Sequence, residues 1–250
     1  MMSDLFDPLA KSLRNQQLVA LATVIRGKEI GSKLLIWPNG KTSGSLNSAD
    51  LEEQVLQRAQ GLFEQQKSQR VQIPPGEETE VFIEVFPPSP KLIIVGAVHV
   101  AIHLITFAKE LGFRTVVVDP RSAFATPERF AHADRLIVEW PHQALLASDF
   151  NEGTYLVVLS HDEKLDNPAL KLALEGPCRY IGALGSRRTH AKRTASLKEM
   201  GITDEQLSRI YAPIGLDLGG RRPQEIAIAV MAQIVAVRNG AENAEKKGRS

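Results

Sequence analysis

The sequence has little of what marks several specialised classes of protein. Its one cysteine, Cys178, rules out a disulfide within the chain, and no Cys/His cluster has the spacing of a metal site. No apolar run approaches the roughly 18 residues of a membrane-spanning helix, and the polar first residues do not resemble a secretory signal. A formal net charge of +1 argues against a broad nucleic-acid or lipid surface. We therefore expect a cytoplasmic protein with no metal site, no nucleic-acid partner and no membrane association.

The rest of the composition is that of an ordinary globular protein. With 43% hydrophobic and 24% charged residues, the chain can bury the core of one large domain or two modest ones. Pro87, Pro88 and Pro90 follow closely on one another, and prolines favour an extended, stiff path. We expect a first domain at residues 1–86, a linker at 87–90, a second domain at 91–239 and a flexible tail at 240–250.

The pattern of the first domain predicts a small α+β unit. Leu5, Leu9 and Leu13 recur every four residues and predict a short helix within residues 3–17. Asn47 and Ser48 offer a helix N-cap before an apolar stripe, which predicts a second helix. Apolar runs predict strands at residues 18–25, 33–37, 70–73 and 79–86.

Residues 91–119 organise the second domain, because they predict a strand, a glycine turn, a helix and another strand in succession. The first strand ends at Gly96, Gly112 stands at a helix C-cap, and the second strand ends in Asp119. This is the opening unit of a dinucleotide-binding domain. Further strands are expected at residues 135–139, 155–159 and 179–184, with helices at 168–174, 189–200 and 223–238. The alternation predicts an α/β fold, a Rossmann-like parallel sheet with helices on both faces.

The glycine fingerprint of this unit departs from its usual form at one position. The pattern G-x-G-x-x-G/A is represented by Gly96, Ala97, Val98, His99, Val100 and Ala101. Val98 replaces the middle glycine, which normally lets a pyrophosphate approach the backbone. Asp119 lies 23 residues after Gly96, close to the spacing of a ribose-binding carboxylate. The pattern favours cofactor binding at this turn, although His99 could serve only packing and Asp119 only turn capping.

Polar residues and glycines come after the other predicted strands, where ligands bind in open parallel sheets. Arg121 comes shortly after the second strand, and Ser160, His161 and Asp162 come after the strand at 155–159. The next strand leads into Gly185, Ser186, Arg187 and Arg188. These four precede a helix N-terminus, where backbone N–H groups, the helix dipole and arginine donors can hold an anion. The alternative is a plain turn with two solvated arginines.

The pair His161 and Asp162, and the separate residue Asp217, each have a functional interpretation and a plain structural one. His161 and Asp162 could form a catalytic acid–base pair, but adjacent residues of a strand point to opposite faces, and the pair could belong to an ordinary loop. Asp217 precedes two glycines and two arginines before the last predicted helix. We interpret that segment as a turn first and as an anion site second.

Five stretches of the second domain follow one another in the same order as the motifs of one protein family. They are GAVHVA, VVVDPRSAFATPERF, LSHDEKLDNPAL, YIGALGSRR and APIGLDLGGRRPQEIAIAVMAQI. They resemble GAGHVA, the D-P-R segment, T-H-D-x-x-x-D-x-x-x-L, Y-I-G-x-x-G-S-R-R and the closing P-I-G-L-D-I-G…P-x-E-I-A of one family. This is the XdhC/CoxI family, accessory proteins for the maturation of molybdenum hydroxylases. The resemblance covers about residues 91–238.

The resemblance implies a Rossmann-type domain after a smaller N-terminal domain. It also implies a chaperone that binds the molybdenum cofactor (molybdopterin), aids its sulfuration and delivers it to an apo-hydroxylase such as xanthine dehydrogenase. A sulfurtransferase is a further implied partner, and a homodimer is left open. The cofactor carries a phosphate or pyrophosphate, which suits helix N-termini. The residues themselves allow two alternative functions. One is an NAD(P)-dependent oxidoreductase in which Asp119 binds the ribose and His161 is the acid–base catalyst, and the other is a non-catalytic interaction module.

The N-terminal part departs from the family. ALATVIRG and GSKLLIWPNG resemble its first strands, but the S-A-P-R-R-P-like segment between them is missing. The family's G-S-v-G-G-G-C-v-E is represented by residues 44–52, with Asp50 at the cysteine position. A carboxylate cannot act as a soft thiolate ligand for molybdenum or as a sulfur carrier. Together with Val98, this predicts a divergent member of the family.

Overall fold

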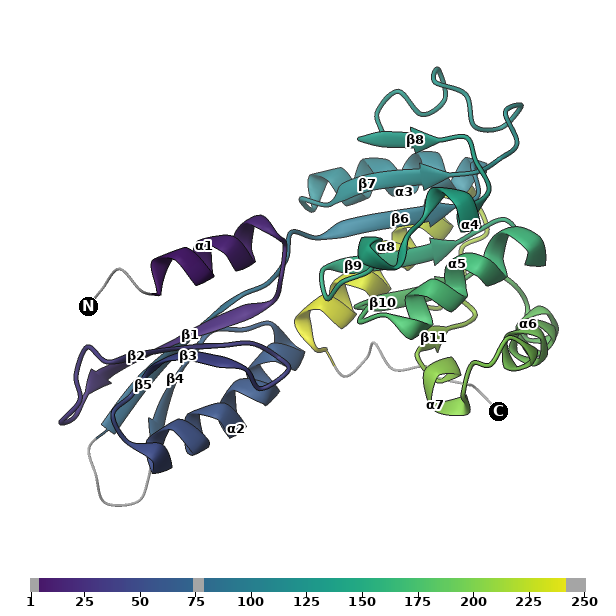
Figure 1. Ribbon diagram of the computed structural model, residues 1–250. Coiled ribbons are helices and arrows are strands. Elements are labelled where there is room, and N and C mark those ends of the chain that lie inside the picture. Colours follow the sequence, from purple (N-terminus) through teal and green to yellow (C-terminus); the bar gives the residue numbers. More distant parts are fainter. Residues whose placement is uncertain (1–4, 74–78, 242–250) are drawn as a thin grey trace. The chain divides into compact units, whose positions relative to one another are not determined.

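The computed structural model describes residues 5–73 and 79–241, and the chain divides between Pro88 and Ser89 into two compact units (Figure 1). Each unit has a hydrophobic core of its own. One core fills the N-terminal unit, and two cores lie on the two faces of the sheet of the C-terminal unit.

The N-terminal unit is an antiparallel sheet with a helix packed on it. Its elements are α1 (Phe6–Arg14), β1 (Val19–Arg26), β2 (Lys33–Ile36), β3 (Thr42–Ser45), α2 (Ala49–Gln65), β4 (Gln69–Ile73) and β5 (Thr79–Phe86). The strand order is β3-β2-β1-β5-β4. Val55 and Ala59 of α2 share a core with Ala20, Ala22 and Val24 of β1. The predicted helices and four strands of this unit are confirmed.

One strand of this sheet, β3, is absent from the sequence-based prediction. Its residues are Thr, Ser, Gly and Ser, which offer no apolar side chain and no alternation. The strand forms because it pairs with β2 as an edge strand, with Lys33 opposite Ser45 and Ile36 opposite Thr42. Pairing geometry, set by the turn between the strands, here replaces hydrophobic patterning.

The C-terminal unit alternates strands and helices around a parallel sheet. Its elements are β6 (Lys91–Val95), α3 (His99–Glu110), β7 (Arg114–Val118), β8 (Arg135–Ile137), α4 (Pro141–Ala144), the 3-10 turn η1 (Ala147–Asp149), β9 (Thr154–Val158), α5 (Glu163–Glu175), β10 (Tyr180–Ala183), α6 (Arg187–Glu199), α7 (Asp204–Leu207), β11 (Ile210–Tyr211) and α8 (Pro223–Asn239). The strand order is β11-β10-β9-β6-β7-β8, and each pairing is parallel. Numbered within the unit, this is the 3-2-1-4-5-6 order of the Rossmann fold.

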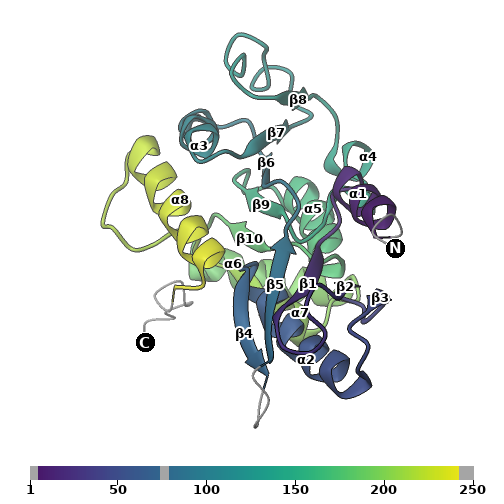
Figure 2. The ribbon, with the colours of Figure 1, turned by 90° about the vertical axis from the view of Figure 1, so that its left-hand side faces the viewer.

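Helices cover both faces of this sheet, as the sequence predicts. Figure 2 shows α3 and α8 together on one face and α5 on the other. The side chains of β6 alternate between the two cores: Leu92 and Ile94 face α3 and α8, whereas Ile93 and Val95 face α5. Strands buried on both faces therefore appear in the sequence as continuous apolar runs. The predicted α/β Rossmann-like architecture is confirmed.

The start of α5 corrects one prediction. The sequence predicts a short helix at residues 168–174. The helix begins instead at Glu163, because the Asp162 side chain accepts a hydrogen bond from the backbone N–H of Lys164 at 2.9 Å and caps the helix. Pro168 lies inside the helix. Most of the predicted tail, residues 242–250, lies outside the described part of the chain.

Candidate functional site

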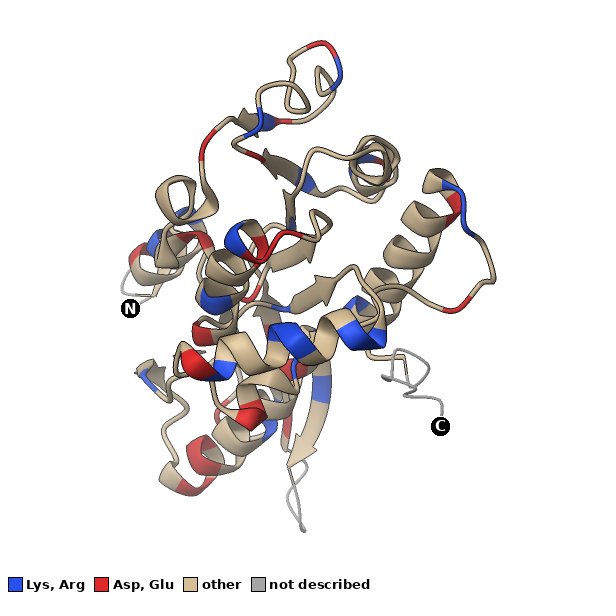
Figure 3. Cartoon of the chain, turned by 90° about the vertical axis from the view of Figure 1, so that its right-hand side faces the viewer, with Lys and Arg blue, Asp and Glu red and all other residues tan. Residues whose placement is uncertain are grey.

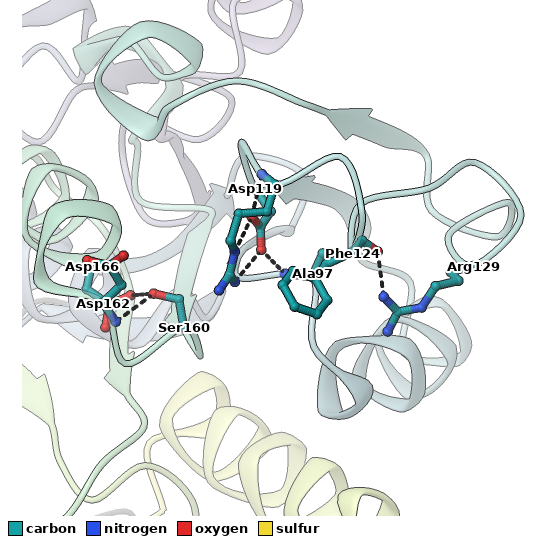
Figure 4. Close-up of polar contacts among 8 residues, drawn as sticks. Ala97, Asp119, Phe124, Arg129, Ser160, Asp162 and Asp166 are labelled. Atoms are coloured by element: carbon teal, nitrogen blue, oxygen red, sulfur yellow. Dashed lines mark hydrogen bonds and ion pairs between the residues drawn. The ribbon is translucent and has the colours of Figure 1, made fainter.

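The carboxyl ends of β6 and β9 mark the point at which this sheet reverses its direction of growth. β7 and β8 extend the sheet from one side of β6, and β9, β10 and β11 extend it from the other. Ligands of open α/β sheets bind beyond the strand ends at such a point. Figure 4 shows polar contacts at this edge, where Gly96, Asp119 and Ser160 come after β6, β7 and β9.

The turn after β6 depends on Gly96 for its backbone conformation and contains Val98 at the position of the middle fingerprint glycine. Gly96 has a φ of 108°, and a Cβ atom there would lie 2.9 Å from the backbone nitrogen of Ser160, so the close approach of the two segments requires glycine. Val98 is the N-cap residue of α3 with φ −92° and ψ 172°, an extended conformation open to any residue. Valine therefore causes no backbone strain here. It places a branched side chain where the fingerprint has only backbone.

Asp119 points inward and joins this turn to Arg121 (Figure 4). Its Oδ2 accepts from the backbone N–H of Ala97 and from Nη2 of Arg121, both at 2.7 Å, and its Oδ1 accepts from the backbone N–H and Nε of Arg121, both at 2.9 Å. The side chain of Asp119 is 0% exposed. A ribose contact would require these bonds to break, and that role stays a prediction.

The ionised form of Asp119 is stabilised by its donors. Burial alone would raise the pKa of Asp119, but the hydrogen bonds from Arg121 and Ala97 together outweigh burial and hold the pKa below its ordinary value. A carboxyl group whose pKa is lowered by folding stabilises the fold above its unfolded pKa, near 4, and that stabilisation is lost as the pH falls through the folded pKa.

Replacing Asp119 by asparagine is expected to lower the free energy of unfolding at pH 7 by about 1.5–3 kcal/mol, because charge-assisted hydrogen bonds are lost. The difference from the wild type should shrink as the pH falls below about 4. Urea denaturation between pH 3 and 7 measures both effects. Asp162→Asn is the matched control, since asparagine is an equally good N-cap and the exposed site should change by less than about 0.5 kcal/mol. Equal stabilities of the two variants would contradict the role given to Asp119.

Arg121 and His99 both reach the surface, unlike Asp119. The Arg121 side chain is partly exposed, and His99 is the exposed first residue of α3. Hydrogen bonding to Asp119 raises the pKa of Arg121 against the effect of burial, and the charges of Asp162 and Asp166 act in the same direction. The acidic side chains that follow β9 thus favour the charged form of Arg121 as Asp119 does.

The segment after β9 is held by a buried network. Ser160 Oγ donates to Asp166 Oδ1 at 2.6 Å, and Asp166 Oδ2 accepts from Arg193 Nη2 at 3.1 Å. The same Nη2 atom donates to the carbonyl oxygen of Leu184 at 3.1 Å. The side chains of Arg193 and Asp166 are 3% and 1% exposed. The network thus joins the chain after β9 to the chain after β10 through α5 and α6.

His161 and Asp162 are neighbours in sequence but are not paired in space. His161 is exposed and has a φ of 62°, a left-handed conformation that is uncommon for residues other than glycine. Within the described part of the chain, the imidazole makes no hydrogen bond to Asp162, whose carboxylate caps α5. Residues with a strained backbone cluster at functional sites, so His161 is a better candidate for a functional residue than Asp162. A catalytic role for either residue stays a prediction.

The segment from Gly185 to Arg188 forms the start of α6. Ser186 is the N-cap residue, and its Oγ accepts from the backbone N–H of Thr189 at 3.2 Å. Arg187 and Arg188 are exposed in the first turn, which contains no acidic residue. Lys and Arg recur along this helix, as the blue segments of Figure 3 indicate. These features suit an anion, and anion binding there stays a prediction.

Asp217 is exposed in the segment between β11 and α8. The backbone N–H groups of Arg221 and Arg222 at the start of α8 both donate to Oε2 of Glu225 at 2.9 Å. A carboxylate of the protein thus occupies the place where an anion would bind. These bonds fit the turn interpretation, and ligand binding at Asp217 stays a prediction.

Asp166, Arg193 and Phe124 contribute to this edge but are absent from the predicted site residues. Asp166 and Arg193 lie 27 positions apart, so no local pattern joins them. A weak signal exists for Arg193, because the helix places it four residues before Leu197, the other buried residue of α6. Phe124 belongs to a predicted loop, and its exposure could not be inferred from the sequence.

In the N-terminal unit, Asp50 lies in the first turn of α2, where an acidic side chain favours the helix dipole. The chain before α2 is held by Glu52, whose Oε1 accepts from Ser45 Oγ at 2.7 Å and from the backbone N–H of Leu46 at 2.8 Å.

Across residues 5–73 and 79–241, no group of three His, Cys, Asp or Glu side chains is arranged to hold a metal ion, and no helix is long and apolar enough to cross a membrane.

Comparison with protein-family models identifies the family. The model described as the XdhC Rossmann domain matches residues 92–234, and the model described as the XdhC and CoxI family matches residues 12–74. The chain belongs to the XdhC family. The predicted resemblance is confirmed, and the second model extends it to residues 12–74 of the N-terminal part.

Three curated relatives are similar to this XdhC-family chain. The uncharacterized protein YqeB of Escherichia coli is 28% identical over 223 residues, which cover 84% of this chain and 41% of YqeB. A Bacillus subtilis protein described as a probable xanthine dehydrogenase subunit is 34% identical over 65% of this chain and 47% of its own length. The molybdenum cofactor insertion chaperone PaoD of Escherichia coli is 35% identical over 38% of this chain and 30% of PaoD. The chain spans less than half the length of each relative.

A solved structure supports the fold. The crystal structure of a protein described as a xanthine dehydrogenase from Bacillus halodurans superposes with a TM-score of 0.54 and covers 96% of this chain and 97% of that one. At 20% sequence identity, this similarity shows a shared fold alone.

Proposed function

We propose that this protein is an accessory factor that binds the molybdenum cofactor and assists its sulfuration or insertion into an apo molybdenum hydroxylase of the xanthine dehydrogenase type. The observation that supports this most directly is membership of the XdhC family across the Rossmann unit, together with the similarity to PaoD. The implied partners are the apo-hydroxylase and a sulfurtransferase, in the cytoplasm. Assembly of two copies into a homodimer is compatible with this proposal.

The residues at the carboxyl edge suit one end of such a cofactor. A phosphate group needs donors and a positive field, and the start of α6 offers Ser186, Arg187 and Arg188 without a nearby acid in its first turn. The metal end finds no comparable partner, because the one cysteine is buried and Asp50 stands at the family's cysteine position. We therefore propose that the protein holds the cofactor through its organic part and leaves the molybdenum without a thiolate from this chain.

The dinucleotide alternative has less support from the geometry. Val98 fills the position of the middle fingerprint glycine, and both oxygens of Asp119 are hydrogen-bonded within the protein. The pairing of His161 with Asp162 that an acid–base site would favour does not form. A non-catalytic interaction module is compatible with the fold, and it differs from our proposal in predicting no cofactor.

The purified protein is expected to retain molybdenum cofactor released from a denatured molybdoenzyme. Gel filtration followed by oxidation of the bound pterin to a fluorescent product measures retention. Arg187→Ala/Arg188→Ala should weaken binding at least about tenfold, because a charge-assisted hydrogen bond is worth about 1.5–3 kcal/mol.

The matched control is Lys171→Ala/Lys198→Ala, which removes the same charge from residues that pair with Glu175 and Asp204. The control should bind like the wild type. Failure of the wild type to retain any cofactor would contradict the proposed function. Equal binding by both double variants would contradict only the site at α6.

A further inference from the structure

Phe124 is an exposed aromatic side chain at the carboxyl edge of the sheet. It lies between β7 and β8 and is 46% exposed, whereas Ala125 and Phe130 of the same segment are buried in the core beneath α3. The segment therefore places other apolar side chains in the interior and directs this large one outward. A single exposed apolar side chain is ordinary on a protein surface, so the contacts that hold this ring carry the argument.

The ring is held in place from one side by Arg121. The Arg121 Cζ atom lies 4.7 Å from the centre of the Phe124 ring, within the range of a cation–π contact. Arg121 is itself fixed, because its Nε and Nη2 donate to the two oxygens of the buried Asp119. The accessible part of the ring is thus the surface that Arg121 leaves uncovered.

The backbone of Phe124 is fixed as well. Its N–H donates to the carbonyl oxygen of Arg121 at 2.9 Å, and its own carbonyl oxygen accepts from Nη1 of Arg129 at 2.6 Å (Figure 4). Ring and backbone are therefore oriented before any ligand arrives. A preformed surface loses little conformational entropy on binding.

The charge at this surface favours a planar ligand over a simple anion. Asp119 neutralises Arg121, so the pair adds little net positive charge for a phosphate. What remains is an aromatic ring backed by a planar guanidinium group, which suits the face of a heteroaromatic ring. Arg121 also comes after β7 and belongs to the same strand-end edge as Gly96 and Ser160.

We propose that Phe124, supported by Arg121, is a stacking surface for a planar heterocycle of the ligand, either the pterin ring or the base of a nucleotide-extended cofactor. This inference rests on the proposed function and adds a recognition residue to it. The phosphate then lies elsewhere on the edge, because the ends of β7 and β10 are separated by three strand spacings, roughly 14 Å.

Phe124→Ala is expected to weaken cofactor binding about 10- to 100-fold, because stacking on an aromatic side chain contributes on this scale. Phe124→Trp should retain binding, and Phe124→Leu should fall between them because it keeps apolar area without a π face. Isothermal titration with the molybdopterin form and with a nucleotide-extended form measures each variant. Loss for both forms assigns the pterin, and loss for the extended form alone assigns the base.

Leu111→Ala is the matched control, since Leu111 is 40% exposed at the far end of α3 and should not affect binding. Wild-type affinity of Phe124→Ala for both forms would overturn the inference and leave the proposed function standing. Absence of binding by the wild type would instead overturn the proposed function. Inorganic pyrophosphate separates the two parts of the edge, because its binding should be insensitive to Phe124→Ala; an equal loss of pyrophosphate would overturn stacking as the role of the ring.

Discussion

Replacing Arg193 by methionine is expected to lower the free energy of unfolding of the C-terminal unit by about 3–5 kcal/mol, the usual effect of removing one member of a buried ion pair. The substitution leaves Asp166 buried with Ser160 as its remaining partner and removes a donor from the Leu184 carbonyl group. Urea denaturation of the full chain measures the effect. A Trp37→Phe background makes Trp140 the only tryptophan, so that its fluorescence reports the C-terminal unit.

Two variants decide whether the pair itself is responsible. Lys192→Met changes the exposed neighbour on the same helix and should alter stability by less than about 0.5 kcal/mol. Asp166→Leu/Arg193→Met removes both charges together and should recover most of the loss, since an apolar pair of similar volume is often as stable as a buried ion pair. A double variant no more stable than Arg193→Met would show that packing of the arginine stem, and not the unpaired carboxylate, accounts for the loss.

The energetics of this pair indicate a role in positioning. In the part of the chain that the structure describes, Nε and Nη1 of Arg193 are buried without a hydrogen-bond partner, so the desolvation of the guanidinium group is only partly offset. Burial raises the pKa of Asp166, although Ser160 and Arg193 act against that effect. An ion pair whose role was stability alone would be expected to have hydrogen-bond partners for all of its buried donors. The pair does provide a fixed connection between the segments after β9 and β10.

Much of the fold could be predicted from the sequence, because parallel strands buried on both faces leave a strong pattern. Apolar runs such as residues 92–95 end in glycines and polar residues, and helical stripes separate them. The order of the strands is a consequence of the Rossmann connection and not of any local signal. β3 and the start of α5 were not predicted, because an edge pairing and a capping carboxylate decide them.

The sequence could predict which residues of the site follow the strand ends, but not how their side chains are directed or paired. The residues directly after the predicted strands include Gly96, Asp119 and Ser160, which the fold places at one edge. The direction of a side chain cannot be inferred in this way: Asp119 points inward to Arg121, and Asp162 turns back to cap α5. Contacts between distant elements, as in the Ser160–Asp166–Arg193 network, require the fold itself. These are the features that determine which residues remain free for a ligand.

Cys178 in the native protein is expected to react with an aromatic disulfide reagent at pH 8 about a thousandfold more slowly than free cysteine. Burial raises the pKa of the Cys178 thiol to about 12, so its thiolate fraction at pH 8 is about 10⁻⁴, against about 0.2 for an unperturbed thiol. The Sγ atom also lies 3.2 Å from the carbonyl oxygens of both Thr154 and Tyr180, and its one S–H group donates to either or is shared between them. Absorbance of the released thiolate measures the rate, and guanidinium chloride should restore one fast equivalent. A fast equivalent from the folded protein would contradict the expectation.

The burial of Cys178 limits how sulfur could reach the cofactor under the proposed function. Cys178 is the one cysteine of the sequence and it is buried, so a persulfide carried by this chain has no accessible site in the folded state. A sulfur donor must then act directly on the bound cofactor. Cys178→Ala should consequently support sulfuration of a hydroxylase as well as the wild type does, provided that thermal unfolding shows it to be folded. Loss of sulfuration in a folded Cys178→Ala variant, with cofactor retention unchanged, would mean that the chain relays sulfur itself and that the core around Cys178 opens to allow it.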